Sequence, residues 1–340
     1  MKNGGIKFFK KLVLVSLPVL FLIILYLVLD PFKVIFKYKS FYKSGVPSYV
    51  TLDKNYIGIE TFLNNYENYK YEAFILGNSR SLYYEANTWK KYINTDRCIH
   101  LDGSGESLYD ISRKIKFLDS RNVMISHVLI ILDNSTLLQI NEQKTHLQLA
   151  HPALSGKSWF DFELEFFKTF LSRDFFITFL DFKISNQVKD YMKEDLLLND
   201  VPMEYIPKYN EIRFTYFENL IKTDEKEYYT PKRMEVFTPR DSIQKYSKPV
   251  IEEIQNKILS EMAEIFKKQN AEFKIIINPE YDQIKFNTDD LEILNKLFGK
   301  QNVFDFSGIN SITNDYHNYY ENSHYRPHVA EFIMHKIYKK

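Results

Sequence analysis

The chain has 340 residues, and its 45 lysines and arginines nearly balance its 44 aspartates and glutamates. This neutrality argues against a dedicated nucleic-acid-binding protein, which would carry a basic surplus, so no nucleic-acid partner is expected. The only cysteine is Cys98, which rules out an internal disulfide and the cysteine-rich zinc patterns. A chain of this length can bury a large core, either in one large domain or in two ordinary ones.

An apolar run near the amino terminus predicts a membrane anchor. Residues 12–29 contain no charged side chain and are interrupted only by Ser16 and Pro18. At about 1.5 Å per residue, a helix of this length nearly crosses the hydrocarbon core of a bilayer. A cleaved signal peptide is the rival interpretation, but the run is long for one and no small-residue cleavage site follows it.

The lysines around this run indicate its orientation. Four lysines precede it, which favours a cytoplasmic amino terminus, although four more follow it by residue 43. We predict a cytoplasmic tail over 1–11, a single-pass transmembrane anchor over 12–29 and an extracytoplasmic domain beyond it. The protein is therefore expected in the cell membrane, with the lipid bilayer as a partner.

The remaining chain shows the alternation of an α/β domain after a stalk predicted over 30–60. Short apolar runs predict buried strands at Ala73–Leu76, His127–Leu132, Phe273–Ile277 and Val303–Phe304. Stretches between and after them predict helices at Ser107–Leu118, Lys248–Lys268, Thr288–Phe298 and Pro327–Tyr338. This order predicts one domain over 61–340 that contains a mostly parallel sheet flanked by helices.

Residues 139–245 do not show this alternation of predicted strands and helices. The region is aromatic and charged, with helical patches and few strand signals. We interpret it as a helical insertion in the α/β domain. It could serve as a lid or an acceptor-binding wall, or it could be an elaborated core without a direct role.

A serine follows the first predicted strand in the sequence Gly77-Asn78-Ser79-Arg80. Parallel α/β sheets bind ligands beyond the carboxyl ends of their strands, and a helix that starts there offers a partly positive end. Ser79 is therefore a candidate nucleophile. The alternative is that Ser79 only caps a strand-to-helix turn.

A carboxylate and a histidine stand close together near the end of the chain. Glu321 precedes His324 by three residues, in a predicted loop before the last helix. This spacing lets the carboxylate accept a hydrogen bond from one imidazole nitrogen while the other nitrogen faces a serine. Since a serine hydroxyl needs a base to become a nucleophile, Ser79, His324 and Glu321 form a candidate catalytic triad.

These two motifs resemble those of the SGNH (GDSL-like) esterase and acyltransferase superfamily. Gly77-Asn78-Ser79-Arg80 is similar to its first motif, and Glu321-x-x-His324 is similar to its closing Asp-x-x-His, with Asn78 and Glu321 each replacing the usual aspartate. The resemblance spans about residues 70–340. It implies a flavodoxin-like sheet, a serine nucleophile, no metal and no other cofactor.

The resemblance also implies an oxyanion hole. The family uses the N–H of the serine, a glycine after the second strand, which Gly103 or Gly105 would supply, and an asparagine after the third, which Asn134 would supply. The glycine that usually precedes this asparagine is missing, and ordinary turns and caps are the alternative interpretation. Arg80 could hold an anionic or carbonyl group of the substrate, or could form a surface salt bridge.

The anchor, the Gly-x-Ser-Arg start and the His-Tyr finish resemble SGNH-like proteins that act on envelope polysaccharides. Examples are the alginate O-acetylation proteins and the esterase-like protein of teichoic-acid D-alanylation. This resemblance implies a membrane-anchored serine esterase or O-acyltransferase that acts on acyl groups, above all acetyl, of a cell-envelope polysaccharide. Expected partners are the acylated polysaccharide or an acyl donor, and a membrane-bound acyltransferase. The alternative is a catalytically inactive scaffold or polysaccharide-binding protein.

Overall fold

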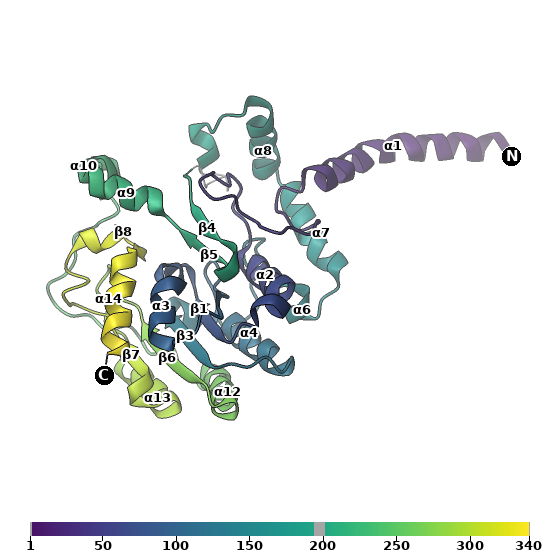
Figure 1. Ribbon diagram of the computed structural model, residues 1–340. Coiled ribbons are helices and arrows are strands. Elements are labelled where there is room, and N and C mark those ends of the chain that lie inside the picture. The colour runs from purple at the N-terminus through teal and green to yellow at the C-terminus, as the bar shows by residue number, and fades with distance from the viewer. Residues whose placement is uncertain (1, 194–200, 340) are drawn as a thin grey trace. The chain divides into compact units, whose positions relative to one another are not determined.

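The structure, a computed structural model, describes residues 2–193 and 201–339 (Figure 1). It divides into two compact units. The first combines Met1–Phe41, Ser48–Leu52 and Lys157–Asp200, and the second combines Tyr42–Pro47, Asp53–Gly156 and Val201–Lys340. The predicted insertion is therefore shared between the two units.

The second unit is built on a five-stranded parallel sheet. Its strands are β1 (Ala73–Gly77), β2 (Cys98–His100), β3 (His127–Leu132), β6 (Glu272–Ile277) and β7 (Val303–Asp305), in the spatial order β2-β1-β3-β6-β7. Counted along the chain this order is 2-1-3-4-5, which occurs in doubly wound α/β folds. The prediction of an α/β domain with a parallel sheet flanked by helices is confirmed. The strand order reverses between β1 and β3, which creates a switch point at their carboxyl ends.

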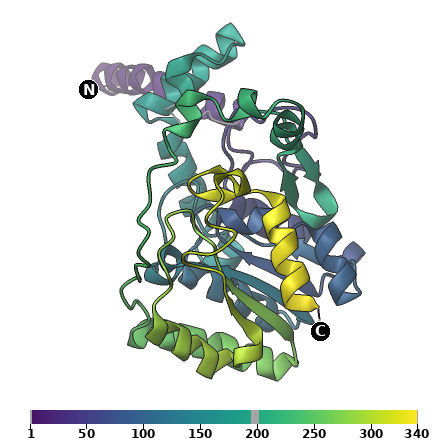
Figure 2. The same cartoon turned by 90° about the vertical axis from the view of Figure 1, so that its left-hand side faces the viewer.

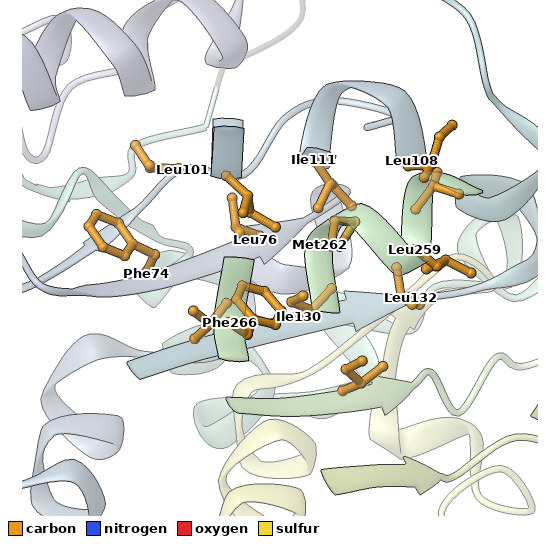
Figure 3. Close-up of a cluster of buried hydrophobic side chains, with 14 of the residues drawn as sticks. Phe74, Leu76, Leu101, Leu108, Ile111, Ile130, Leu132, Leu259, Met262 and Phe266 are labelled. Carbon is orange, nitrogen blue, oxygen red and sulfur yellow. The ribbon is translucent and has the colours of Figure 1, made fainter. Parts of the chain in front are cut away.

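One face of the sheet carries the main hydrophobic core, shown in Figure 3. It is covered by α2 (Lys54–Tyr69), α4 (Leu108–Ser120), α12 (Glu253–Gln269) and α13 (Thr288–Phe298). Alternate strand residues point to this face, so that Phe74 and Leu76 of β1 pack with Ile130 and Leu132 of β3. The residues between them are also buried, because helices cover the opposite face.

The opposite face is covered by α3 (Ala86–Ile93) and α14 (Pro327–Tyr338), which lie side by side in Figure 1. The yellow helix α14 faces the viewer in Figure 2. The indole of Trp89 is fully buried and donates a hydrogen bond to the Tyr338 hydroxyl, 2.8 Å away. Helix α14 begins with Pro327, whose missing N–H costs nothing in a first turn. Its position fixes the short hairpin that precedes it, β8 (Tyr319–Glu321) and β9 (His324–Tyr325).

Helix α3 was not predicted from the sequence, and the loop predicted around Glu321 and His324 is the hairpin β8–β9. Three further differences have local reasons. Strand β2 has only three residues, too few to show a periodicity. Helix α12 starts at Glu253 instead of Lys248, because Glu252 and Gln255 form a capping box after Pro249. Helix α2 starts at Lys54, inside the range predicted as a stalk, because the Asp53 carboxylate caps its first N–H groups.

The insertion region is mostly helical in the structure. It contains α6 (Pro152–Ser155), α7 (Trp159–Phe170), α8 (Arg173–Ser185), α9 (Thr215–Thr223), α10 (Glu225–Tyr228) and α11 (Pro231–Met234). A two-stranded hairpin that the sequence did not indicate is also present, made of β4 (Glu204–Ile206) and β5 (Glu211–Arg213). The short helix α5 (Asn134–Leu138) lies just before this region.

The first unit joins the amino-terminal helix to two insertion helices. Helix α1 (Lys2–Leu29) contains the segment Lys10–Leu29, which is long and apolar enough to cross a membrane. Aromatic side chains of α7 and α8 pack against Tyr26 and Phe32, at and just beyond its end. The helix expected over 12–29 is therefore present.

Candidate active site

Ser79 lies immediately beyond the carboxyl end of β1. Gly77 ends the strand with φ +146°, and a Cβ there would lie 2.6 Å from the carbonyl oxygen of Ile131, so only glycine fits. Asn78 then caps a short 3₁₀ helix over Ser79–Tyr83, because its Oδ1 accepts a hydrogen bond from the Arg80 N–H, at 3.1 Å. The Asn78 amide also donates to Asp133, which fixes this turn to the end of β3. Ser79 is thus held at the β1/β3 switch point, where ligands bind in folds of this kind.

His324 reaches the same point from the hairpin before α14. Two buried tyrosines fix this hairpin to the end of β6. The Tyr319 hydroxyl donates to the Pro279 carbonyl and the Tyr325 hydroxyl donates to Asn278 Oδ1, each over 2.8 Å. Within the hairpin, Glu321 and His324 are paired across the two strands.

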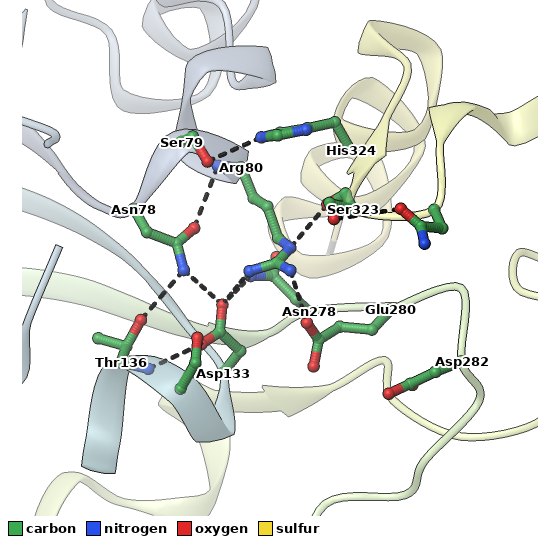
Figure 4. A network of polar contacts seen from close by, with 12 residues as sticks. Asn78, Ser79, Arg80, Asp133, Thr136, Asn278, Glu280, Asp282, Ser323 and His324 are labelled. Carbon is green, nitrogen blue, oxygen red and sulfur yellow. Dashed lines mark hydrogen bonds and ion pairs between the residues drawn. The ribbon is translucent and has the colours of Figure 1, made fainter. Parts of the chain in front are cut away.

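The three predicted catalytic side chains form one hydrogen-bonded series. His324 Nε2 lies 2.7 Å from Ser79 Oγ, although the two residues are 245 positions apart in the sequence (Figure 4). His324 Nδ1 is hydrogen-bonded to Glu321 Oε1. Burial alone would raise the pKa of Glu321, but the hydrogen bond and charge of His324, together with the Ser323 N–H, hold it below its usual value. Glu321 is therefore charged at neutral pH and can fix the imidazole tautomer.

Arg80 ties the histidine loop to the sheet. Its guanidinium lies 2.7 Å from the Asp133 carboxylate and 2.8 Å from that of Glu280. Its Nε donates to the carbonyl oxygen of Ser323 over 2.8 Å, next to His324 in the chain. These contacts, visible in Figure 4, link the ends of β1, β3 and β6 to the hairpin. The guanidinium is therefore held by protein groups on several sides.

The two carboxylates on Arg80 differ in their electrostatics. Burial would raise the pKa of Asp133, but Arg80, Ser135 and the Thr136 N–H keep it below its usual value. Burial raises the pKa of Glu280 to about 7, because the effect of Arg80 does not fully offset it and Asp133 adds repulsion. Asp133 thus remains charged near neutrality, whereas Glu280 exchanges a proton there.

The two glycines predicted for the oxyanion hole differ in their surroundings, because Gly103 is buried and Gly105 is exposed. The Gly103 N–H donates to the Gly77 carbonyl oxygen over 3.1 Å, and a Cβ on Gly103 would collide with the Glu106 carboxylate and the Asn55 side chain. Gly103 therefore supports the loop, and a role as oxyanion donor would require that hydrogen bond to break. Gly105 is exposed in the same loop with φ +58°.

Asn134, the third predicted oxyanion group, lines a cavity of about 670 Å³ over the ends of β3 and β6. Its lining includes apolar side chains, among them Val250, Ile277, Ile284 and Phe286, and polar ones, among them Lys248, Glu280 and Asp282. This volume lies within the range of small-molecule sites. Because neighbouring strands are about 4.8 Å apart, the cavity begins one strand away from Ser79.

No family model matches this chain, and no curated protein matches it either. Its chemistry follows from the geometry of its own residues. Among residues 2–193 and 201–339, no group of three or more histidine, cysteine, aspartate or glutamate side chains could hold a metal ion.

Sequence reasoning missed Asn278 and Glu280 as members of this site. They directly follow the predicted strand Phe273–Ile277, so the rule that singled out Ser79 also applies to them. What the sequence lacks is the strand order, which places the end of β6 next to that of β3.

Proposed function

We propose that this protein is a membrane-anchored serine esterase or O-acyltransferase of the SGNH type. Its substrate would be an acyl group, above all acetyl, on a cell-envelope polysaccharide. The observation that carries the proposal is the 2.7 Å contact between Ser79 Oγ and His324 Nε2, with Glu321 on the other imidazole nitrogen. The strand order 2-1-3-4-5 supports the flavodoxin-like sheet of that superfamily.

In the proposed reaction, Ser79 Oγ attacks the acyl carbonyl carbon while His324 Nε2 takes the hydroxyl proton. Glu321 stabilises the imidazolium that forms. His324 then returns the proton to the sugar oxygen, the ester bond breaks, and the acyl group remains on Ser79. Water or a second sugar hydroxyl then attacks the acyl carbon and passes its proton to His324. The bond between the acyl group and Ser79 Oγ breaks, and His324 returns the proton to Ser79 Oγ. Water yields the free acid, whereas a hydroxyl yields a new ester.

The negative oxygen of the tetrahedral intermediate needs fixed hydrogen-bond donors. We assign this role to the N–H groups of Ser79 and Gly105 and to the side-chain amide of Asn134. Gly103 is not included, because its N–H donates to Gly77. Arg80 acts by holding the Ser323–His324 segment in position, in place of the direct substrate contact that the sequence left open.

The cavity beside Asn134 supports a sugar as the rest of the substrate. A pyranose ring has apolar faces and hydroxyl groups around its edge. The cavity is lined both by apolar side chains, such as Val250 and Phe286, and by polar groups, such as Lys248 and Asp282. A ligand bound there would place an ester substituent towards the end of β1.

The apolar helix α1 supports a location of the protein in the cell membrane. We propose that Lys10–Leu29 spans the membrane, with the amino terminus in the cytoplasm and the sheet-containing unit outside. As a transferase, the enzyme would need an acyl donor at the membrane, which a membrane-bound acyltransferase would provide.

The test is hydrolysis of p-nitrophenyl acetate by the purified full-length chain. We expect Ser79→Ala and His324→Ala to lower kcat/KM by about 10³-fold or more, because each removes a member of one catalytic unit. Ser242→Ala, at an exposed position, is the matched control and should retain the full rate. Equal rates in all four proteins would refute the catalytic proposal. Full complementation in cells by Ser79→Ala would favour the inactive scaffold instead.

A further inference from the structure

Helices α7 and α8 of the first unit are attached to the end of the apolar helix α1. Tyr26, near the end of the segment Lys10–Leu29, packs against two rings of α7, Phe167 at 5.2 Å and Phe170 at 5.3 Å between centroids. Just beyond the segment, the Phe32 ring lies 4.7 Å from that of Phe175 in α8. The three helices are thus joined through aromatic contacts at one end of α1.

These contacts set the depth of α7 in a membrane that α1 crosses. At about 1.5 Å per residue, Tyr26 lies about 5 Å from the end of the spanning segment at Leu29. This is the boundary zone in which tyrosine and tryptophan gather in membrane proteins. The last turns of α7, which pack on Tyr26 through Phe167 and Phe170, therefore lie at the same depth. Figure 1 shows that α7 and α8 run across the direction of α1, so they can follow the plane of the membrane surface.

Helix α8 carries apolar side chains on its exposed side as well as on its buried side, and Asp181 lies between the exposed ones. One side is buried in the unit, through Phe175, Phe179 and Phe182. The other side presents Ile177 and Ile184, which are 54% and 85% exposed and lie seven residues apart, on the same face of the helix. A surface helix of a water-soluble domain normally turns a polar face outwards.

Helix α7 also exposes apolar side chains. Its first two residues, Trp159 and Phe160, are 50% and 74% exposed, and Leu171 directly after its end is 41% exposed. Charges of both signs accompany them, such as Asp161, Lys168 and Arg173. A mixed charge gives little electrostatic attraction to a membrane, so apolar burial must supply most of the binding free energy.

We propose that α7 and α8 form an interfacial platform, which lies in the headgroup region of the lipid bilayer and buries Trp159, Phe160, Ile177 and Ile184 among the lipids. The occupant of this surface is therefore the membrane that holds α1, and not a partner protein. The inference rests on the anchoring part of the proposed function and is independent of the catalytic part. It assigns a role to the 157–185 portion of the insertion.

The chain's two tryptophans provide a direct test. Trp89 is fully buried in the second unit, whereas Trp159 lies on the platform. The full-length chain is reconstituted in phosphatidylcholine nanodiscs with either ordinary or brominated acyl chains, since bromine quenches tryptophan emission on contact. We expect brominated lipid to reduce the emission of the wild type. The Trp159→Phe variant, which keeps a buried Trp89, should emit equally in both lipids.

A second measurement separates the platform from the anchor. If wild-type emission is equal in both lipids while the chain resists extraction from vesicles by alkaline carbonate, the platform proposal is wrong and the anchor stands. Persistent quenching in Trp159→Phe would also overturn the platform, because Trp89 would then be the quenched residue. Release of the chain by carbonate would overturn the anchor and the platform together. Ester hydrolysis is measured separately and bears on neither.

Discussion

Glu321 shows how a substituted residue can retain its geometry. It replaces the aspartate of the motif that it resembles and is one methylene longer, yet its carboxylate bonds to His324 Nδ1 because both residues are paired in the β8–β9 hairpin. We expect Glu321→Gln to lower kcat by about 10³ to 10⁴-fold, since the amide stabilises neither the tautomer nor the imidazolium. The kcat of Glu321→Asp should lie between those of the wild type and of Glu321→Gln. Steady-state hydrolysis of p-nitrophenyl acetate provides the measurement, and a fully active Glu321→Gln would contradict the assigned role.

Arg80 is a positioning residue in this account. Its guanidinium donates one directional hydrogen bond to the Ser323 carbonyl oxygen. It also forms ion pairs with the carboxylates of Asp133 and Glu280. Arg80→Lys keeps the charge but cannot make these contacts together, because an ammonium lacks the planar fork of a guanidinium. We expect kcat to fall by about 10²-fold with little change in KM, since misplacing His324 affects chemistry more than binding. Arg121→Lys, at the exposed end of α4, is the matched control. A change confined to KM would indicate direct substrate contact.

Glu280 links the site to pH. Burial raises its pKa to about 7 from an ordinary value of 4.5. Between these values the folded protein keeps a proton that the unfolded chain has released. The stabilising contribution is therefore complete below about pH 4.5 and is lost as the pH rises through about 7. The urea midpoint of the wild type should fall relative to that of Glu280→Gln from about pH 5 to about pH 7.5. A constant difference between the urea midpoints of the wild type and of Glu280→Gln over that range would show that Glu280 does not titrate there.

Single residues were predictable where the motif is local. The strand end before Ser79 could be recognised from neighbouring residues, and so could the three-residue spacing of Glu321 and His324. The partners of Arg80 were not predictable, because Asp133 and Glu280 reach it only through the order of three strands. The hydrogen bond that occupies the Gly103 N–H likewise depends on how β2 aligns with β1.

At the scale of elements, the loop after β2 depends on a glycine for packing. A side chain on Gly103 would collide with two buried groups, Glu106 and Asn55. Gly103→Ala should lower the free energy of unfolding by about 1–3 kcal/mol, the usual cost of overpacking. Gly58→Ala in α2 is the control, because its Cβ would make only ordinary contacts, the nearest at 3.5 Å, and alanine favours helix by about 1 kcal/mol. Denaturant unfolding compares the two, and equal stability would contradict this packing account.

Elements with strong end signals were located well from the sequence. Helix α13 begins after the capping side chain of Asn287 and ends at Gly299, and α14 begins at Pro327. Elements without such signals were missed. The hairpin β4–β5 has strands of three residues each, which depend on their tertiary surroundings more than on their own propensity.

At the scale of the whole molecule, the lone cysteine allows a test of sidedness. Cys98 is fully buried in β2, and burial raises the pKa of its thiol to about 12, so it should not react with maleimides in the folded protein. Ser242→Cys would place a reactive thiol at an exposed position of the second unit. We expect a membrane-impermeant maleimide to label this variant on intact cells. Asn3→Cys, on the tail predicted to be cytoplasmic, should be labelled only after lysis. The reverse pattern would invert the proposed topology.

The 245-residue separation between Ser79 and His324 has a consequence for biosynthesis. Under the proposed function, a chain that enters the membrane amino terminus first would deliver Ser79 early, while His324 is still on or near the ribosome. Such a chain would be unable to attack esters before α14 packs on the sheet and brings His324 to Ser79. Under the proposed function, a prematurely terminated product that lacks the β8–β9 hairpin would likewise be inert, so only a chain that carries this hairpin would act on esters.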